Sequence, residues 1–253
     1  MFLPLRDENP TRSTPLVTWT LIAINGVVFL FEVVIGDEAL HGVFGAFGVV
    51  PAELLAQPVG RSYTLISSMF LHGGWMHLIG NMWFLYIFGD NVEDRLGKPL
   101  FVLFYLAAGI GAAFLQVAVQ PASTIPTIGA SGAIAGVLGA YAIVYPGARV
   151  LTLVWLFIFV RLIHVPAVLF LGFWFAMQFL SGAGALASAG GGGVAWWAHI
   201  GGFMVGGAVG YLLRLRSRPR PLRTAGSNPG VIIPFDRGRR PQDPSPRDRR
   251  TFH

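Results

Sequence analysis

The sequence predicts an all-α protein that crosses a membrane six times and has a large loop after its first span. Of the 253 residues, 54% are hydrophobic and only 12% are charged, whereas soluble domains have about 25% charged residues. The mean hydropathy is +0.62. Apolar runs recur along the chain that are long enough to cross a hydrocarbon layer of about 30 Å. Together these observations exclude an ordinary soluble domain.

The amino-terminal part predicts a short polar segment, one span and a large loop. Residues 1–15 carry charges of both signs, and we expect no cleavable signal peptide there. The first span is expected at residues 16–35, directly after a Ser-Thr-Pro helix start. Glu32 falls near the far end of this span, where we expect it to reach water. Residues 36–71 mix Gly, Pro and acidic residues with apolar ones, which predicts a loop with short interfacial helices.

Five further spans follow, bounded by Gly, Pro and polar residues. They are expected at residues 75–89, 100–119, 131–145, 166–180 and 194–213. Residues 149–165 are apolar but carry two arginines and a histidine, so we expect them to lie partly at the membrane interface. Residues 181–193 are rich in Gly, Ala and Ser, which predicts a mobile loop. Residues 214–253 are rich in Pro, Arg and Ser, which predicts a disordered tail.

The basic residues predict the orientation in the membrane. With both ends of the chain on one side, that side receives every one of the 18 Lys and Arg residues except Arg61. By the positive-inside rule, both termini are therefore expected in the cytoplasm. The arginines of the tail should attract anionic lipid, and this accounts for them without a nucleic-acid partner. The high Arg, Ala and Gly content suggests a bacterial inner membrane, and nothing in the sequence indicates an oligomeric state.

Polar side chains inside membrane spans are costly and therefore point to function. The second, fourth and sixth spans all begin on the outer face, and each places polar residues near its own beginning. These residues are His77, Asn81, Ser131 and His199. His77 and Asn81 are four residues apart and so share one helix face. The topology follows from the loops and the charges, without any assumption about catalysis. The common depth of the four residues is therefore independent support for a site near the outer leaflet.

Ser131 stands where the loop 121–130 becomes the fourth helix, between Gly129 and Gly132. This helix has 15 residues, which corresponds to about 22 Å, and the hydrocarbon layer is about 30 Å thick. We therefore expect Ser131 to lie below the membrane surface. The loop should dip in to meet it, enclosed by protein or facing a watery cavity.

Small residues recur on one face of the fourth helix and one face of the sixth. They are Gly132, Gly136 and Ala140 in the fourth helix, and Ala198, Gly202, Gly206 and Gly210 in the sixth. Small residues at this spacing let two helices approach closely. Packing these faces together would bring His199 towards Ser131, as a nucleophile and its base require.

These residues predict acyl transfer by a serine. His199 would accept the proton of Ser131, and Asn81, His77 and nearby backbone N–H groups would stabilise the oxyanion. No Asp or Glu is expected at this depth to orient His199, so the unit is a dyad rather than a triad. The chain has no cysteine, which excludes thiolate chemistry.

Each of these residues also admits a simpler role. Ser131 could merely cap a tightly packed helix, because serine is a common N-cap residue. His77, Asn81 and His199 could serve only to join or pack helices. A metal site from His72, His77 and His199 is conceivable, although it would lack a carboxylate or cysteine ligand. We expect His72 to hold the loop or the mouth of the site in place.

Four segments carry a resemblance to a known family. They are GASG at 129–132, HLIGN at 77–81, AHIGGFMVG at 198–206 and FGDNVEDRLG at 88–97. In this order and topology they resemble the rhomboid family of intramembrane serine proteases. The resemblance covers residues 16–213, the expected six-helix core, and leaves out the cytoplasmic segment 1–15 and the tail 214–253.

The resemblance implies a protease that cuts the transmembrane segments of other membrane proteins and needs no cofactor or metal. It implies Ser131 as the nucleophile, His199 as the general base, and His77 and Asn81 as oxyanion-stabilising residues. The residues expected to support this site are His72, Gly129, Gly132, Gly202 and Gly206. Glu93 matches a family carboxylate with a structural role, and the fifth helix with the loop 181–193 matches the region thought to gate substrate access.

Two positions depart from the family pattern. Some members carry an aromatic residue four places after the nucleophile, where it stacks on the base, and Ala135 stands there in this chain. The Trp-Arg pair of the first outer loop is replaced by Tyr63 and Thr64.

Two other classes of function are weighed against the protease. A relative that binds membrane proteins without cutting them usually lacks the serine or the histidine, and this sequence has both. A transporter would need charged residues along a path through the bilayer, and we find none at mid-depth.

Overall fold

Helix α7 (Ser131–Val144) lies at the centre of the computed structural model, which describes residues 2–156, 158–187 and 194–216. Every residue of this helix from Gly132 to Ala142 is buried. Its 14 residues correspond to about 21 Å of helix, which is shorter than a bilayer core. The expected short fourth helix is therefore present.

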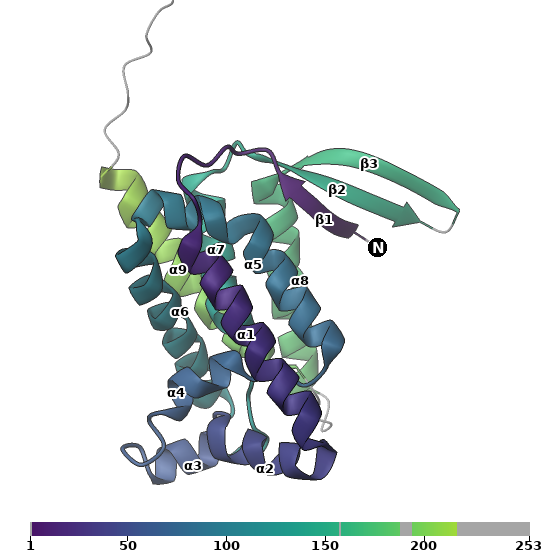
Figure 1. Cartoon of the computed structure of the whole chain (residues 1–253). Helices are drawn as coiled ribbons and strands as arrows, with labels where there is room; N and C mark the ends of the chain where they lie inside the picture. The colour runs from purple at the N-terminus through teal and green to yellow at the C-terminus, as the bar shows by residue number, and fades with distance from the viewer. Residues whose placement is uncertain (1, 157, 188–193, 217–253) are drawn as a thin grey trace, which may run out of the picture. The chain divides into compact units, whose positions relative to one another are not determined.

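Five longer helices pack around α7 or against its neighbours (Figure 1). They are α1 (Leu16–Ile35), α5 (Trp75–Leu96), α6 (Lys98–Val119), α8 (Ala167–Ala187) and α9 (Trp196–Arg216). Among the described residues, α1, α6, α8 and α9 are long and apolar enough to cross a membrane, and α7 is a shorter apolar helix. Helix α5 does not join the four, because polar residues such as His77, Asn81 and Asn91 interrupt its apolar sequence. The chain is thus a multi-pass membrane protein. The length and composition of its described helices identify four spans and one shorter apolar helix, not the six spans expected.

The close packing of α7 and α9 depends on glycine. A Cβ atom added at Gly202 would lie 1.9 Å from the carbonyl oxygen of Gly132, and one at Gly206 would lie 1.8 Å from that of Gly136. No side chain fits at such distances, so the two backbones are in direct contact. The expected packing of these two small-residue faces is found.

Two buried glutamates hold α1 at its two ends. The Glu93 carboxylate accepts the backbone N–H groups of Val17 (3.0 Å) and Thr18 (2.8 Å), and also the Thr18 hydroxyl (2.8 Å). It thereby satisfies N–H groups at the start of α1, which have no acceptor within the helix. At the other end, Glu32 is only 1% exposed and accepts the backbone N–H of His72 at 3.2 Å. The expectation that Glu32 reaches water is wrong, because the loop before α5 covers it.

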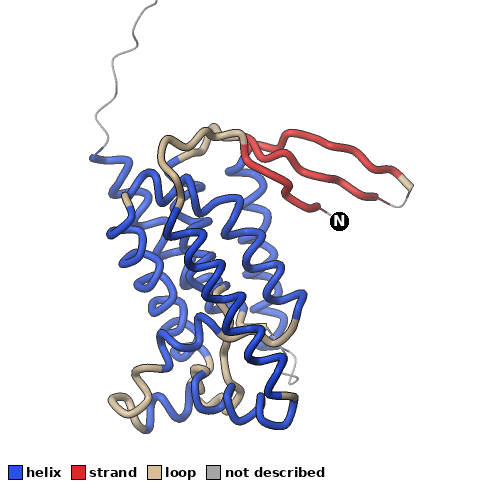
Figure 2. Tube along the Cα trace, in the orientation of Figure 1, coloured by secondary structure: helices blue, strands red, loops and turns tan. Residues whose placement is uncertain are grey.

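The structure is mostly helical, as expected, but the expectation of an all-α protein holds only in part, because the structure also contains a small antiparallel sheet. Its strands are β1 (Phe2–Asp7), β2 (Arg149–Leu156) and β3 (Phe159–Pro166), in the order β1-β2-β3. Strands β2 and β3 are rich in the branched and aromatic residues that favour strands, and β1 adds to β2 with an irregularity between Pro4 and Arg6. Figure 2 shows the strands at the opposite end of the helices from the first outer loop.

The first outer loop contains the short helices that its composition predicts. They are α2 (Asp37–Phe47), α3 (Pro51–Ala56), α4 (Thr64–Ser67) and the 3₁₀ turn η1 (Ser68–Phe70). The loop 121–130 joins it through Val49 and Thr127, whose backbones exchange hydrogen bonds of 3.0 and 2.8 Å. These two outer segments are therefore fixed to each other next to the start of α7.

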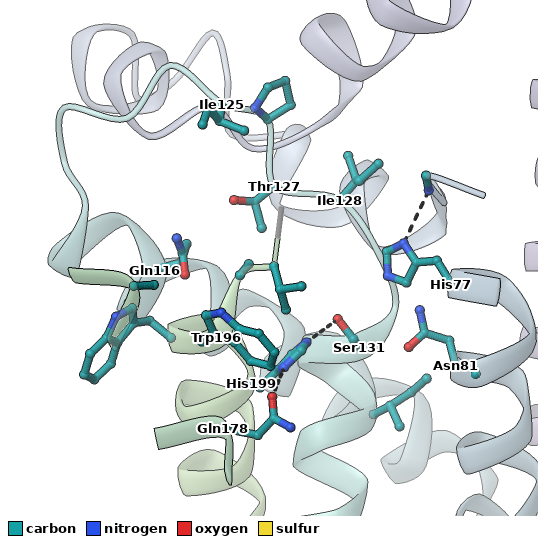
Figure 3. Close-up of a pocket in the computed structure, with 18 of the residues that line it drawn as sticks. His77, Asn81, Gln116, Ile125, Thr127, Ile128, Ser131, Gln178, Trp196 and His199 are labelled. Atoms are coloured by element: carbon teal, nitrogen blue, oxygen red, sulfur yellow. Dashed lines mark hydrogen bonds between the residues drawn. The ribbon is translucent and has the colours of Figure 1, made fainter. Parts of the chain in front are cut away.

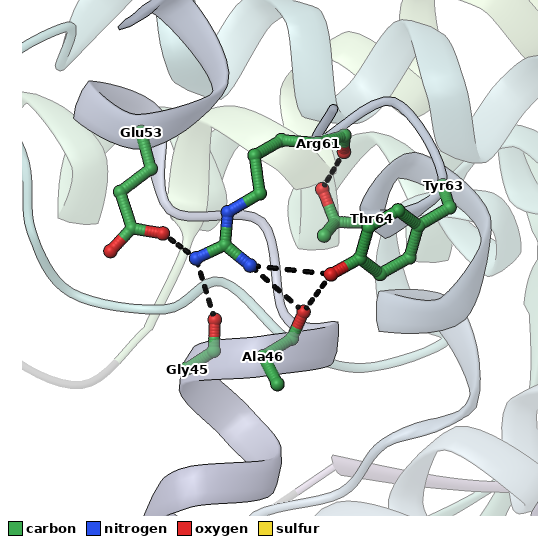
Figure 4. A network of polar contacts seen from close by, with 6 residues as sticks. All are labelled: Gly45, Ala46, Glu53, Arg61, Tyr63 and Thr64. Atoms are coloured by element: carbon green, nitrogen blue, oxygen red, sulfur yellow. Dashed lines mark hydrogen bonds and ion pairs between the residues drawn. The ribbon is translucent and has the colours of Figure 1, made fainter. Parts of the chain in front are cut away.

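Arg61, the one cation expected on the outer side, ties this loop together (Figure 4). Its guanidinium donates to the carbonyl oxygens of Ala46 (3.1 Å) and Gly45 (3.3 Å) and pairs with the Glu53 carboxylate. The Tyr63 hydroxyl donates to the same Ala46 oxygen at 2.8 Å. Although the loop lacks the Trp-Arg pair, an arginine and an aromatic residue still fix the end of α2.

Two predicted segments fall wholly or partly outside the described residues. The expectation of a loop at residues 181–193 is wrong for residues 181–187, which continue helix α8, and residues 188–193 are not described. Of the expected disordered tail 214–253, residues 214–216 end helix α9, and the rest is not described. Mobility of the loop and disorder of the tail stay predictions.

Candidate active site

Ser131 is the first residue of α7, and the turn before it requires glycine. Gly129 has a φ angle of +118°, in the region that favours glycine. Its N–H donates to the Ser68 carbonyl oxygen at 2.8 Å. A Cβ atom at Gly129 would also lie 2.7 Å from Nε2 of His77. The glycine therefore both shapes the turn and admits the His77 ring beside Ser131.

The Ser131 hydroxyl and the His199 imidazole form a hydrogen bond between α7 and α9 (Figure 3). Oγ of Ser131 lies 2.8 Å from Nε2 of His199. This is the distance range expected of a nucleophile and its general base. The contact between the glycines of the two helices brings these side chains together.

The other side of the His199 ring is held by residues that the sequence patterns did not single out. Nδ1 of His199 lies 2.7 Å from Oε1 of Gln178. The Trp174 ring covers one face of the imidazole, with centroids 5.9 Å apart and planes at 36°. Trp196 meets the ring edge-on at 6.2 Å. The aromatic support that Ala135 cannot give thus comes from α8 and from the start of α9.

The hydrogen bonds of His77 identify its tautomer. The backbone N–H of Gly73 donates to Nδ1 of His77 at 3.3 Å. Nδ1 is therefore an acceptor, and a neutral ring must carry its proton on Nε2. Nε2 is the ring atom nearest to a Cβ built at Gly129. The N–H at Nε2 of His77 therefore lies beside the Gly129 turn, close to Ser131.

Asn81 lies one helical turn after His77 and also faces this space (Figure 3). It is only 8% exposed, and within the described part of the chain its Nδ2 has no hydrogen-bond partner. Buried amide groups are normally satisfied, so an unpaired donor beside a serine is notable. The first N–H groups of α7 also lack an intrahelical acceptor and lie at the positive end of the helix. Several donors therefore converge near Ser131.

His72 supports this arrangement from behind. It is fully buried, its Nδ1 donates to the Phe70 carbonyl oxygen at 3.3 Å, and its backbone is held by Glu32. Its ring meets His77 edge-on, with centroids 5.1 Å apart. His72 thus packs against His77 but does not line the cavity. Ser131 and His199 both do. Among the residues that the structure describes, no three His, Asp or Glu side chains are grouped to hold a metal ion.

The cavity has a volume of about 770 Å³ and is lined by residues near the starts of α5, α7 and α9. Its lining includes all four polar residues expected at one depth, together with Gln116, Trp174 and Gln178. Ligand cavities are typically about 300–1,000 Å³. The space is therefore large enough for a short stretch of peptide next to the serine.

Two glutamines in this lining were missed at the sequence level. Oε1 of Gln116 accepts the N–H of Ala198 at 3.3 Å, near the start of α9, and its amide donates to Gln120 at 2.6 Å. Gln178 holds His199. Polar residues inside apolar spans are informative, and this applies to both glutamines. They lie in the third and fifth expected spans, however, and not near the starts of the second, fourth and sixth spans, where the other polar residues lie.

Comparison with known proteins gives the family. Residues 59–216 match the Rhomboid domain. The chain is 32% identical over 200 residues to Rhomboid protease GluP of Bacillus subtilis, covering 78% of this chain and 35% of that protein. It is 32% identical over 112 residues to Rhomboid-like protein 11, chloroplastic, of Arabidopsis thaliana (44% and 39%). It is 29% identical over 175 residues to Rhomboid protein 1, mitochondrial, of Saccharomyces cerevisiae (66% and 47%).

The chain spans less than half the length of each of these three relatives. The matched region nevertheless includes α5 to α9, the helices that carry the serine, both site histidines and the asparagine. Since the domain match covers more than half of the chain, the chain belongs to the rhomboid family.

Proposed function

We propose that this chain is an intramembrane serine endopeptidase that cuts the transmembrane segments of other membrane proteins. The observation that carries the proposal is the 2.8 Å contact between Oγ of Ser131 and Nε2 of His199. It lies in a large cavity with an unpaired buried amide, that of Asn81, beside it. A serine that only capped a helix would not need a base, an unpaired donor and a cavity.

The first half of the proposed reaction forms an acyl-enzyme. His199 takes the proton of Ser131 at Nε2 while Oγ attacks the scissile carbonyl carbon. The negative charge that develops on the carbonyl oxygen is stabilised by Nε2–H of His77, Nδ2–H of Asn81 and N–H groups at the start of α7. The C–N bond then breaks as His199 gives its proton to the leaving nitrogen.

The second half of the reaction releases the acyl group. His199 accepts a proton from water, whose oxygen attacks the acyl carbon, and the same donors stabilise the second oxyanion. The ester bond then breaks, and the proton passes back to Oγ of Ser131. Neither half requires a metal or cofactor.

We further propose that α5 also crosses the membrane, as the second of six spans, and that residues 16–213 form the protease core. Helix α5 has 22 residues, enough for a hydrocarbon layer of about 30 Å, and its charged residues cluster at the end that meets β1. Both termini would then be cytoplasmic, with the segment 1–15 and the tail 214–253 on that side of a cell membrane. The cavity would open to the outside, from which water reaches the serine.

Replacement of the nucleophile tests the proposal. Ser131→Ala is expected to abolish cleavage of a model single-pass transmembrane substrate in liposomes, because the variant has no group to form the acyl-enzyme. Ser62→Ala is the matched control, since Ser62 is exposed and its hydroxyl bonds only to a nearby carbonyl oxygen. Undiminished cleavage by folded Ser131→Ala would refute the nucleophile assignment.

A serine-directed fluorophosphonate tests the base. Wild type is expected to react and His199→Ala to remain unlabelled, because a serine hydroxyl is a weak nucleophile without a proton acceptor. Equal labelling of the two proteins would remove the proposed role of His199. A wild-type chain that binds membrane proteins but neither cuts them nor takes the probe would be a binding protein instead.

A further inference from the structure

Helix α8 presents two side chains to the proposed base. Trp174 and Gln178 are four residues apart and so lie on one face of the helix. The first covers the His199 ring and the second lies 2.7 Å from its Nδ1. Figure 3 shows Gln178 on the side of His199 opposite Ser131. The imidazole is thus held between the nucleophile and α8.

The chemistry of the dyad determines the direction of the Gln178 hydrogen bond. Nε2 of His199 must be an acceptor if it is to take the Ser131 proton, so the neutral ring carries its own proton on Nδ1. That N–H requires an acceptor, and Oε1 of Gln178 supplies one. Gln178 is only 8% exposed, so water would not easily replace it. A neutral amide here occupies the place that a carboxylate has in a triad.

Helix α8 is the least buried of the four described helices that are long and apolar enough to cross a membrane. Only 22% of its apolar stretch is buried, whereas the value for α6 is 50%. Several of its large side chains are exposed, including Leu169, Phe173 and Leu180. Its described attachment to the core includes Leu171, which is fully buried in the main hydrophobic cluster. The base therefore depends on a helix at the edge of the bundle.

We propose that Gln178 is a positioning residue for His199, and that the Ser131–His199 pair is aligned only while α8 is docked against α9. Gln178 selects the tautomer with Nε2 free and fixes the ring plane, and Trp174 restricts the tilt of the ring. Displacement of α8 would remove both supports at once and leave His199 free to rotate away from Ser131. This inference rests on the proposed protease function.

Substitutions at Gln178 test the inference in the full chain, with a model transmembrane substrate in liposomes. Gln178→Leu keeps the bulk and removes the acceptor, so kcat should fall by about 10- to 100-fold with KM nearly unchanged. Gln178→Glu restores the acceptor with a negative charge, which favours the imidazolium. The acidic limb of its kcat/KM profile should therefore move to higher pH. Met177→Leu is the control, because Met177 is 44% exposed on the same helix.

A double-mutant cycle tests the role of α8. Leu171→Ala should loosen the helix and lower kcat, and it should have little further effect in the Gln178→Leu background, because both changes release the same histidine. Multiplicative effects of the two substitutions would overturn the dependence on α8 docking.

The remaining outcomes separate this inference from the proposed function. Suppose that wild type cleaves, and that either the kcat of Gln178→Leu stays within twofold of the wild-type value or the acidic limb of the Gln178→Glu profile does not move. Either result would show that Gln178 is no positioning residue, and the protease assignment would stand. If neither wild type nor Met177→Leu cleaves substrate or takes the fluorophosphonate, both ideas fail together. Thermal unfolding of each variant in detergent shows which losses come from misfolding, and the pH profile is read on folded protein.

Discussion

At the scale of single residues, the site contains a buried hydrogen-bond donor close to Ser131 that has no partner in the described part of the chain. Nδ2 of Asn81 is buried without a partner among the described residues, and Asn81 lines the cavity next to Ser131. A negative oxygen formed in front of Ser131 would satisfy Nδ2. In the proposed mechanism, this donor interacts with the negative oxygen of the transition state.

Removing this donor should lower the rate and leave binding intact. Asn81→Ala is expected to reduce kcat by about 10²- to 10³-fold, the usual effect of losing one oxyanion donor. Asn81→Asp, which has the same size but adds negative charge, should be at least as impaired. Steady-state kinetics on the model substrate check both variants. A raised KM with unchanged kcat would instead mean that Asn81 binds the ground state.

The four polar residues of the site could be predicted from the sequence because they stand near the starts of three helices, His77 and Asn81 in α5, Ser131 in α7 and His199 in α9. The support of His199 could not be predicted in the same way. Trp174 lies in an aromatic-rich run, FLGFWFAMQF, in which no spacing distinguishes one ring from another. Gln178 was detectable as a polar residue in an apolar span, but its partner depends on how α8 is rotated.

At the scale of helices and strands, small-residue spacing predicted the most important contact. Every fourth residue on one face of α9 is Gly or Ala, and this face lies against Gly132 and Gly136 of α7. The sheet was not predicted because a short apolar run such as 149–165 fits a strand or a helix equally well. Pairing of β1 with β2 joins segments more than 140 residues apart, which no local pattern reveals.

Two neighbouring glycines of α9 provide a direct test of this contact. In Gly206→Ala the new Cβ would lie 1.8 Å from the Gly136 carbonyl oxygen, so the helices must separate. The upper end of the usual overpacking range is about 3 kcal/mol, so we expect a melting temperature lower by roughly 10 °C and loss of fluorophosphonate labelling. In Gly207→Ala the new Cβ meets nothing within 4 Å, and alanine favours helices.

Gly207→Ala should therefore melt at or slightly above the wild-type temperature and keep its labelling. Thermal unfolding in detergent and probe labelling of both variants check the pair. Equal effects of the two substitutions would show that the α7–α9 contact is looser than these distances indicate.

At the scale of the whole molecule, Asp7 connects the sheet to the carboxyl-terminal parts of α5 and α7. Its Oδ2 accepts the Tyr141 hydroxyl of α7 at 2.6 Å and the Asn91 amide of α5 at 2.9 Å. Nearby, the Trp83 indole N–H donates to the Pro4 carbonyl oxygen at 2.7 Å. The helix that begins with Ser131 is therefore fixed near its other end by the first strand of the chain.

This connection should weaken as the pH rises. Burial raises the pKa of Asp7 from its ordinary 3.8 to about 6, and the nearby Asp90 adds to the rise while the Tyr141 hydrogen bond opposes it. The protonated form is thus favoured in the docked state. Its stabilising contribution is complete below pH 3.8, is lost as the pH rises through about 6, and is absent at pH 7.

Asp7→Asn should remove this dependence, because an amide can accept the Tyr141 hydroxyl at any pH. At pH 7 we expect the docking of β1 to be more favourable in the variant than in wild type. The difference in docking free energy should be about 1 kcal/mol, after allowance for screening by solvent. Hydrogen exchange of the β1 amides measures this as a wild-type to variant rate ratio of about five. The ratio should approach one well below pH 3.8, where Asp7 is protonated in both states. A ratio that stays constant from pH 4 to 7 would show that Asp7 does not titrate with the docking of β1.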